Sequence, residues 1–237
     1  MRAKNLLNAA IPMALAVAVV AGCGAKNGGS ESSATAKSAS VTTSSMSSEN
    51  TSSSGAVSTA SFPITMKHAY GETVIHAKPE RVVTLDWNNA DAVLALGIVP
   101  VGTARANWGP VTDKGLLPWT EAKFKELGTD NPNVFNDLEG YDYEAVAAAK
   151  PDIIVAPYSG MDEKAYKRLS EIAPTLPFRE TAWKTTWREQ TVEAAEALGL
   201  TAEGEKLVAD TDAFIKKNFA KYPNLANKSA AICYINA

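Results

Sequence analysis

Short β-branched runs alternate with amphipathic segments along the chain after residue 80. The runs predict strands at 81–86, 99–103, 152–156, 175–176 and 229–235. The segments around them predict helices at 88–96, 120–127, 143–150, 162–172, 187–199 and 202–220. Strands that alternate with helices favour a parallel sheet, so the expected fold class is α/β. Residues 64–76 alternate on either side of Tyr70-Gly71 and predict a separate hairpin.

Residues that commonly begin and end helices support several of these boundaries. Asn88 or Asn89 is expected to cap a helix that stops at Gly97, and Thr186 with Glu189 fits a capping box. The helix at 202–220 carries one apolar stripe. The stripe consists of Leu207, Val208, Phe214, Ile215 and Phe219.

The first sixty residues follow a different pattern. Arg2 and Lys4 precede an apolar run, 6–22, that ends just before Cys23. As a helix this run would be about 25 Å long, which is shorter than the ~30 Å hydrocarbon core of a bilayer. An export signal at 1–22 is therefore predicted, with an uncleaved membrane anchor as the alternative. The following residues, to 60, are rich in Ser and Thr without any aromatic residue, which predicts a disordered spacer.

Composition narrows the classes of function. The chain is 46% hydrophobic with a formal net charge of −3, and residues 61–237 hold 19 basic and 24 acidic side chains. This acidic balance argues against a nucleic-acid partner. Only 2 Cys and 2 His are present, so neither a disulfide scaffold nor a His-rich metal site is expected. No phosphate-binding glycine loop is found, and Ser159 lacks a nucleophile-elbow motif. We therefore expect no enzyme, no cofactor and no protein ligand to a metal.

The candidate site lies where the predicted strands end, because parallel α/β sheets bind ligands beyond the carboxyl ends of their strands. Indole faces together with a guanidinium suit a flat, partly apolar, anionic ligand. For each of these residues the alternative is a structural role, as a cover over the core or a surface charge. The residues concerned are Trp87, Arg105, Trp108, Tyr158 and Ser159, with Trp183 as a weaker candidate on the loop before the capping box.

Three segments, 81–102, 150–176 and 187–200, together resemble the substrate-binding lipoproteins of iron–siderophore ABC importers. The wider class also binds cobalamin and haem. Cys23 directly follows Val-Ala-Gly, which resembles the lipobox of bacterial lipoproteins. The resemblance implies that Cys23 carries the lipid, palmitate included, and that the protein is anchored on the extracytoplasmic face of the cell membrane.

The resemblance also implies an architecture and a mode of binding. Family members have two α/β lobes joined by a long helix, to which 202–220 corresponds, and the ligand lies between the lobes. A ferric siderophore is bound intact through aromatic and Arg side chains, so the iron needs no ligand from the protein. The candidate residues fall on loops that face the cleft. Asp91 corresponds to an acid that docks the ABC permease, although many relatives have Glu there; its alternative role is a favourable charge at a helix start.

These inferences give a division of the chain. We expect a signal peptide at 1–22, a lipidated Cys and spacer at 23–60, an N-terminal lobe at 61–200, a bridging helix at 201–222 and the start of an incomplete second lobe at 223–237. A chain with one strand of its second lobe is expected to be truncated, to bind its ligand weakly or not at all, and to be a monomer. The alternatives are a cobalamin- or haem-binding protein of the same class and a surface-anchored α/β hydrolase.

Overall fold

The computed structural model describes residues 60–136, 139–231 and 233. The predicted signal peptide, Cys23 and the spacer up to residue 59 lie outside the described residues. None of the helices in the described ranges combines the length and the apolar character that a membrane-spanning segment needs.

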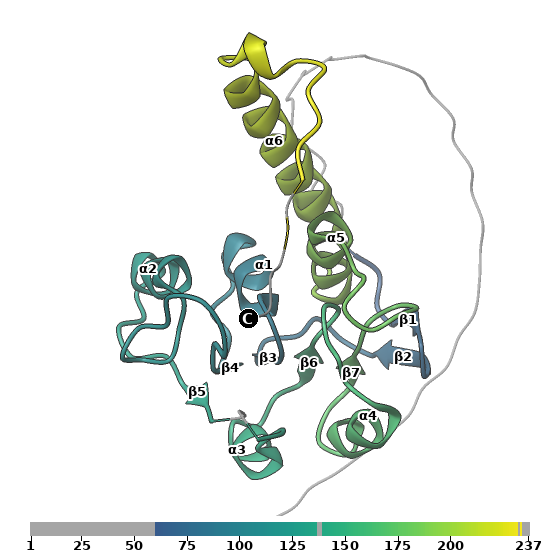
Figure 1. Cartoon of the computed structure of the whole chain (residues 1–237). Helices are drawn as coiled ribbons and strands as arrows, with labels where there is room; N and C mark the ends of the chain where they lie inside the picture. The colour runs from purple at the N-terminus through teal and green to yellow at the C-terminus, as the bar shows by residue number, and fades with distance from the viewer. Residues whose placement is uncertain (1–59, 137–138, 232, 234–237) are drawn as a thin grey trace, which may run out of the picture. The chain divides into compact units, whose positions relative to one another are not determined.

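The centre of the fold is a five-stranded sheet of order β5-β4-β3-β6-β7 (Figure 1). Each neighbouring pair of strands runs parallel, which confirms the predicted α/β class. The strands are short: β3 Val82–Thr84, β4 Gly102–Ala104, β5 Val134–Phe135, β6 Ile153–Val155 and β7 Thr175–Leu176.

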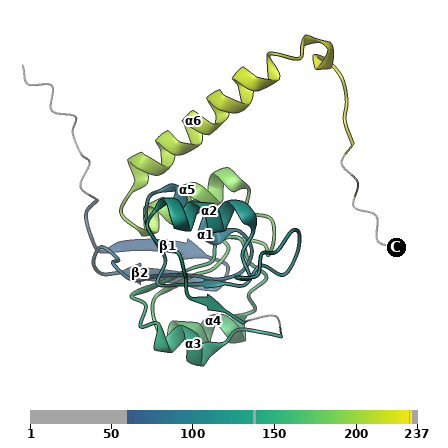
Figure 2. The ribbon, with the colours of Figure 1, turned by 90° about the vertical axis from the view of Figure 1, so that its left-hand side faces the viewer.

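Helices cover both faces of this sheet. Figures 1 and 2 show α3 and α4 on one side and α1, α2 and α5 on the other. The bounds are α1 Asn89–Ala95, α2 Pro118–Glu126, α3 Tyr143–Ala148, α4 Glu163–Ser170 and α5 Trp187–Ala197, followed by α6 Thr201–Phe219 and a 3-10 turn at Pro223–Leu225.

Coverage on both faces explains why the strands appear as continuous apolar runs. Successive side chains of a strand point to opposite faces. Val82 and Ile153 accordingly pack in a core cluster with residues of α1 and α5. Their neighbours Val83 and Ile154 pack in a second cluster with residues of α3 and α4.

The predicted hairpin at 64–76 is also confirmed. Strands β1, Ile64–His68, and β2, Gly71–Ile75, pair antiparallel. Met66 and Ile75 are buried in the same core cluster as α1 and α5. Gly71 has a φ of 124°, a conformation that side chains disfavour, so glycine permits the tight turn.

Most predicted helix ends are correct, with one exception. The capping box of Thr186 and Glu189 is formed at the start of α5, and Gly97 ends α1 with a φ of 82°. Asn88 occupies the capping position of α1, but its side chain makes no cap hydrogen bond because its backbone is left-handed, with a φ of 59°. Asn89 lies inside the helix and has a different role, described below.

One strand is missed by the sequence prediction, and one predicted strand is wrong. The sequence pattern misses the short strand β5, because its two residues lie in a segment rich in Gly, Pro and Asn, which favours a loop. The strand predicted at 229–235 is wrong for its described residues, 229–231 and 233, which have no regular structure. A strand needs a neighbour to satisfy its backbone hydrogen bonds, and among the described strands none pairs with this segment.

Helix α6 falls within the range predicted for a bridging helix. It crosses α5 closely at Gly204, where a Cβ would lie 2.3 Å from the Cβ of Ala195. Much of its apolar stripe is uncovered in the described structure: Phe214, Ile215 and Phe219 are 66%, 48% and 54% exposed. Its role as a bridge between lobes stays a prediction.

Candidate functional site

A cavity of about 170 Å³ lies at the carboxyl ends of β3 and β4, where the sequence predicts a ligand site. Three residues predicted to contact a ligand, Trp87, Arg105 and Trp183, lie together there, although they come from different loops. The lining residues that carry the argument are Asp86, Trp87, Asp91, Arg105, Tyr141 and Trp183.

Trp108 stands beside this cavity. Its ring meets the ring of Trp87 edge to face, with 6.1 Å between the centroids. The Trp108 side chain is 64% exposed, so it offers a large apolar surface to solvent. A pair of indoles at the mouth of a cavity is suited to contact with the organic part of a ligand.

Trp87 is presented by an unusual backbone turn between β3 and α1. The residues on either side of it, Asp86 and Asn88, have φ values of 60° and 59°. Asp and Asn tolerate this left-handed conformation better than most side chains. The Asp86 carboxylate also accepts a hydrogen bond from the Tyr141 hydroxyl, at 2.6 Å. The turn is thus stabilised by Tyr141, a residue distant in sequence that lies just before α3.

Asn89, the second residue after Trp87, fixes the same turn through its buried side chain. Its amide nitrogen donates to the carbonyl oxygens of Leu85 and Tyr158, at 2.6 and 2.9 Å. Its amide oxygen accepts from the backbone N–H of Tyr158 and from the side chain of Gln190, at 3.2 and 2.9 Å. The side chain is completely buried. One amide therefore joins the end of β3, the loop after β6, and α5, and it positions both Trp87 and Tyr158.

Arg105 is placed by a fold-back of the segment that follows β4. Its backbone N–H donates to the carbonyl of Phe135, and the next N–H, of Ala106, donates to the carbonyl of Gly115 at 2.8 Å. Gly115 has a φ of 78°, and a Cβ on it would lie 2.7 Å from Nη1 of Arg105. Glycine at 115 is therefore required for the observed position of the guanidinium.

Trp183 lies against a second glycine. A Cβ on Gly160 would come within 2.4 Å of the indole nitrogen of Trp183. The Trp183 ring meets that of Tyr158 edge to face at 5.3 Å, and its backbone N–H donates to the carbonyl of Ser159 at 3.0 Å. The loop that carries Trp183 thus packs directly on the loop after β6.

The same packing corrects the expectation for Ser159. Its side chain is fully buried and is not part of the cavity lining, so its hydroxyl is not presented at the ligand edge. The reason is that the Trp183 loop folds over this position. No hydrogen-bond partner for the Ser159 hydroxyl is present among the described residues.

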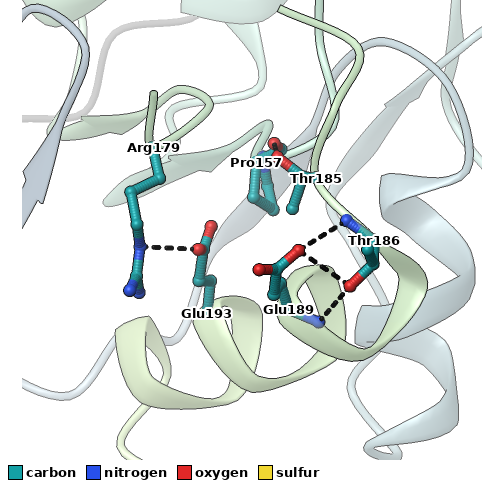
Figure 3. Close-up of polar contacts among 6 residues, drawn as sticks. All are labelled: Pro157, Arg179, Thr185, Thr186, Glu189 and Glu193. Atoms are coloured by element: carbon teal, nitrogen blue, oxygen red, sulfur yellow. Dashed lines mark hydrogen bonds and ion pairs between the residues drawn. The ribbon is translucent and has the colours of Figure 1, made fainter. Parts of the chain in front are cut away.

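Figure 3 shows contacts that join the Trp183 loop to α5 and to the loop after β6. Thr185 donates to the carbonyl of Pro157 at 2.6 Å, and the Glu189 carboxylate accepts from the N–H of Thr186 at 2.8 Å. One turn further along α5, Glu193 forms an ion pair with Nε of Arg179 at 2.9 Å. Burial raises the pKa of Glu193 to about 7, although the Arg179 guanidinium acts to lower it.

Asp91 lies in the first turn of α1 and faces α2. Its two carboxylate oxygens accept from Nε1 of Trp119 at 2.9 Å and from the hydroxyl of Thr120 at 2.5 Å. The side chain thus joins α1 to α2 and lines the cavity. Contact with a permease stays a prediction. Within the described ranges, nowhere do three or more His, Cys, Asp or Glu side chains gather as a metal site would require.

The sequence also matches known proteins. Residues 82–237 match the protein family described as "Periplasmic binding protein". The probable siderophore-binding lipoprotein YfiY of Bacillus subtilis (strain 168) is 31% identical over 176 residues, which cover 71% of this chain and 48% of that protein. The Fe(3+)-citrate-binding protein YfmC of the same organism is 31% identical over 165 residues, which cover 68% of this chain and 48% of that protein.

A solved structure extends the likeness to the fold. The crystal structure of Streptococcus pneumoniae TIGR4 PiaA in complex with ferrichrome has a TM-score of 0.66 and 46% sequence identity, covering 68% of this chain and 53% of that chain. The chain spans about half the length of the curated relatives it matches. Since the family match extends over residues 82–237, the chain belongs to the periplasmic binding protein family.

Proposed function

We propose that this chain is the substrate-binding component of an ABC importer for ferric siderophores, not an enzyme. The names of the relatives support the ligand class, and the signal-like run before Cys23 supports a lipid anchor on the extracytoplasmic face of the membrane. In this proposal the partners are a ferric siderophore, an ABC permease and the membrane through the Cys23 lipid. The protein acts as a monomer.

The observation that carries the proposal is the aromatic and cationic wall at the carboxyl edge of the sheet. Trp87, Trp183 and Arg105 lie at one cavity, and Trp108 extends the apolar surface at its mouth. Such a wall binds the organic shell of a pre-formed iron chelate by stacking and hydrogen bonding. The iron keeps its siderophore ligands throughout, so no protein side chain has to coordinate it.

The alternatives are less well supported. A cobalamin- or haem-binding protein of the same class would also use stacking side chains, and direct titration distinguishes it. The hydrolase alternative requires an accessible nucleophile beside a base. Ser159 is buried, and His68 lies in the β1–β2 hairpin, where burial lowers its pKa and its ring contacts Thr73. The relatives reported above are binding proteins, which gives the hydrolase no support.

Tryptophan fluorescence tests the proposal. The chain from residue 24 onward is titrated with ferrichrome, ferric citrate, cobalamin and haemin, with N-acetyltryptophanamide as the correction for absorbed light. In keeping with the weak binding expected from the sequence, we expect quenching that saturates only at high concentrations of at least one ferric siderophore, and at least a tenfold weaker affinity for Trp87→Ala. Trp187→Phe is the matched control, because Trp187 stacks on Arg188 outside the cavity lining. Saturation by cobalamin or haemin alone would overturn the siderophore assignment.

A further inference from the structure

We infer that Trp183 is a movable cover of the cavity, which rests on Gly160 in the free protein and leaves it to contact a bound chelate. This inference rests on the proposed function and adds a conformational step to it. The Trp183 loop runs from Arg179 to Thr186, and its middle, residues 180–184, is the part that moves. Two features of the structure oppose the covered position, and a few contacts hold it.

The first opposing feature is the Ser159 hydroxyl. The Ser159 side chain is completely buried, and among the described residues its hydroxyl has no hydrogen-bond partner. Burial of a hydroxyl without a partner is unfavourable, and such groups are rare in native proteins. The Trp183 loop folds over Ser159, and the Trp183 N–H donates to the Ser159 carbonyl at 3.0 Å. Movement of the loop would admit water to the hydroxyl and remove this cost.

The second opposing feature is the backbone of Trp183. Its φ is 61°, in the left-handed region that is unfavourable for a bulky side chain. Strain of this kind persists only where the surrounding structure imposes it, and it is concentrated at ligand-binding and switch segments. The contacts that impose it here are the hydrogen bond to Ser159 and the packing of the indole on Gly160 and Tyr158. Loss of these contacts would let Trp183 return to an ordinary backbone conformation.

The ends of the Trp183 loop are fixed, while its middle is lightly held. Arg179 pairs with Glu193 at one end, and Thr185 donates to the carbonyl of Pro157 at the other (Figure 3). Between these ends, Trp183 is 48% exposed. An exposed segment between two fixed ends belongs to the less stable part of a fold, from which moving loops are drawn.

Gly160 provides the surface on which the indole rests. A Cβ at this position would lie 2.4 Å from the indole nitrogen, so a side chain here is incompatible with the covered position. Gly160 does not have a left-handed φ, so its backbone would accept alanine. The glycine is therefore required by the position of Trp183 and not by a turn. Because Trp183 lines the cavity, its departure from Gly160 changes the cavity wall.

Fluorine NMR of the free protein tests the movement. The chain from residue 24 onward is labelled with 5-fluorotryptophan, and Trp183→Phe assigns the Trp183 resonance. We expect exchange broadening of this resonance in relaxation-dispersion experiments, because lid opening takes microseconds or longer. Ser159→Ala removes the buried hydroxyl, so it should reduce the uncovered population at least threefold. Ser170→Ala, at an exposed position on α4, is the control and should leave the resonance unchanged.

Binding supplies the second part of the test. The gallium(III) forms of ferrichrome and citrate are added, since ferric iron would broaden the resonances. We expect a bound chelate to shift the Trp183 resonance and to suppress its exchange. Ser159→Ala should weaken binding at least threefold, because the competent state becomes rarer, whereas Gly160→Ala should not weaken it. In a Trp183→Ala background, Ser159→Ala should leave the affinity unchanged, which shows that the hydroxyl acts through the cover.

The outcomes separate the two proposals. A Trp183 resonance without exchange in the free protein, or one that Ser159→Ala leaves unchanged, would overturn the movable cover whatever the chain binds. Weaker binding by Gly160→Ala than by Ser159→Ala would also overturn it, because the covered position would then be the one that binds. If neither chelate binds, the proposed function fails together with the ligand contact, while the spectra of the free protein still decide whether Trp183 moves.

Discussion

Asn89 and Glu193 are both buried polar residues near the loops that carry Trp87 and Trp183, yet they are stabilised in different ways. Asn89 is fully buried with four hydrogen bonds, all to neutral groups. Glu193 is 3% exposed and relies on an ion pair with Arg179, whose side chain is 57% exposed. The neutral amide orders the Trp87 turn at any pH. The carboxyl ties the Trp183 loop to α5 through a contact that depends on a proton.

The largest effect is expected from Asn89→Ala. This change leaves the carbonyl of Leu85, the carbonyl and backbone N–H of Tyr158, and the side-chain amide of Gln190 without their buried partner. Each lost partner costs about 1–3 kcal/mol, and water entering the vacated space offsets part of the sum, so we expect the free energy of unfolding to fall by about 3 kcal/mol. Urea denaturation at pH 6 and pH 8 measures it. Asn131→Ala, at an exposed position, is the control. A loss of less than about 1 kcal/mol would show that the hydrogen bonds of Asn89 contribute little to the stability of the fold.

Arg179→Ala is the counterpart on α5. It removes the cation that opposes the burial effect on Glu193, so the pKa of this carboxyl should rise further. Because Arg179 is largely exposed, we expect a destabilisation of only about 1–2 kcal/mol at pH 8, and little at pH 5, where the carboxyl is protonated. Thermal unfolding at the two pH values measures the difference. Equal losses at both would contradict a charge-based role.

Gln190→Ala sharpens the comparison, because Gln190 lies on the same helix as Glu193 but belongs to the Asn89 network. The change removes one neutral hydrogen bond, which is worth about 1 kcal/mol. The loss should be the same at pH 5 and pH 8. A pH-dependent loss measured by urea denaturation would mean that the two regions are coupled.

The smallest effect is expected from Glu193→Gln, which removes the titration but keeps an acceptor for Arg179. The pKa of Glu193 is raised from 4.5 to about 7, so the folded state binds a proton that the unfolded state releases. The resulting stability is complete below pH 4.5 and is lost as the pH rises past 7. The variant should therefore match the wild type near pH 4, and its Tm should exceed the wild-type value by about 1–2 °C at pH 8. Calorimetry measures the Tm of both proteins across this pH range. If the Tm of the variant changed with pH in the same way as that of the wild type, the titrating group would be one other than Glu193.

The elements of this fold were predictable where the signal is local. Val82–Thr84 and Ile153–Val155 are β-branched runs buried on both faces, and the Thr186 capping box is complete within four residues. The strand predicted at 229–235 fails in its described residues because a strand depends on a distant partner, which no local pattern supplies.

The position of the candidate site was predictable from the sequence, but the presence of the Asp86 carboxylate in its lining was not. Trp87 and Arg105 follow strands, so the topology alone brings them to one edge. Asp86 is included in the predicted strand, and its place at the cavity depends on a left-handed backbone that the sequence does not reveal. The role of Asn89 depends on partners 69 and 101 positions away along the chain. Contacts of that range arise only from the completed fold.

The left-handed residues on either side of Trp87 have a kinetic consequence. This turn is already bent and is held by hydrogen bonds from Tyr141 and Asn89, so it has little conformational freedom to lose if it binds the proposed ferric chelate. The Trp87 indole therefore already has the orientation that binding requires. Encounter with this wall should therefore proceed in a single fast phase limited by diffusion, without a slow rearrangement of the turn.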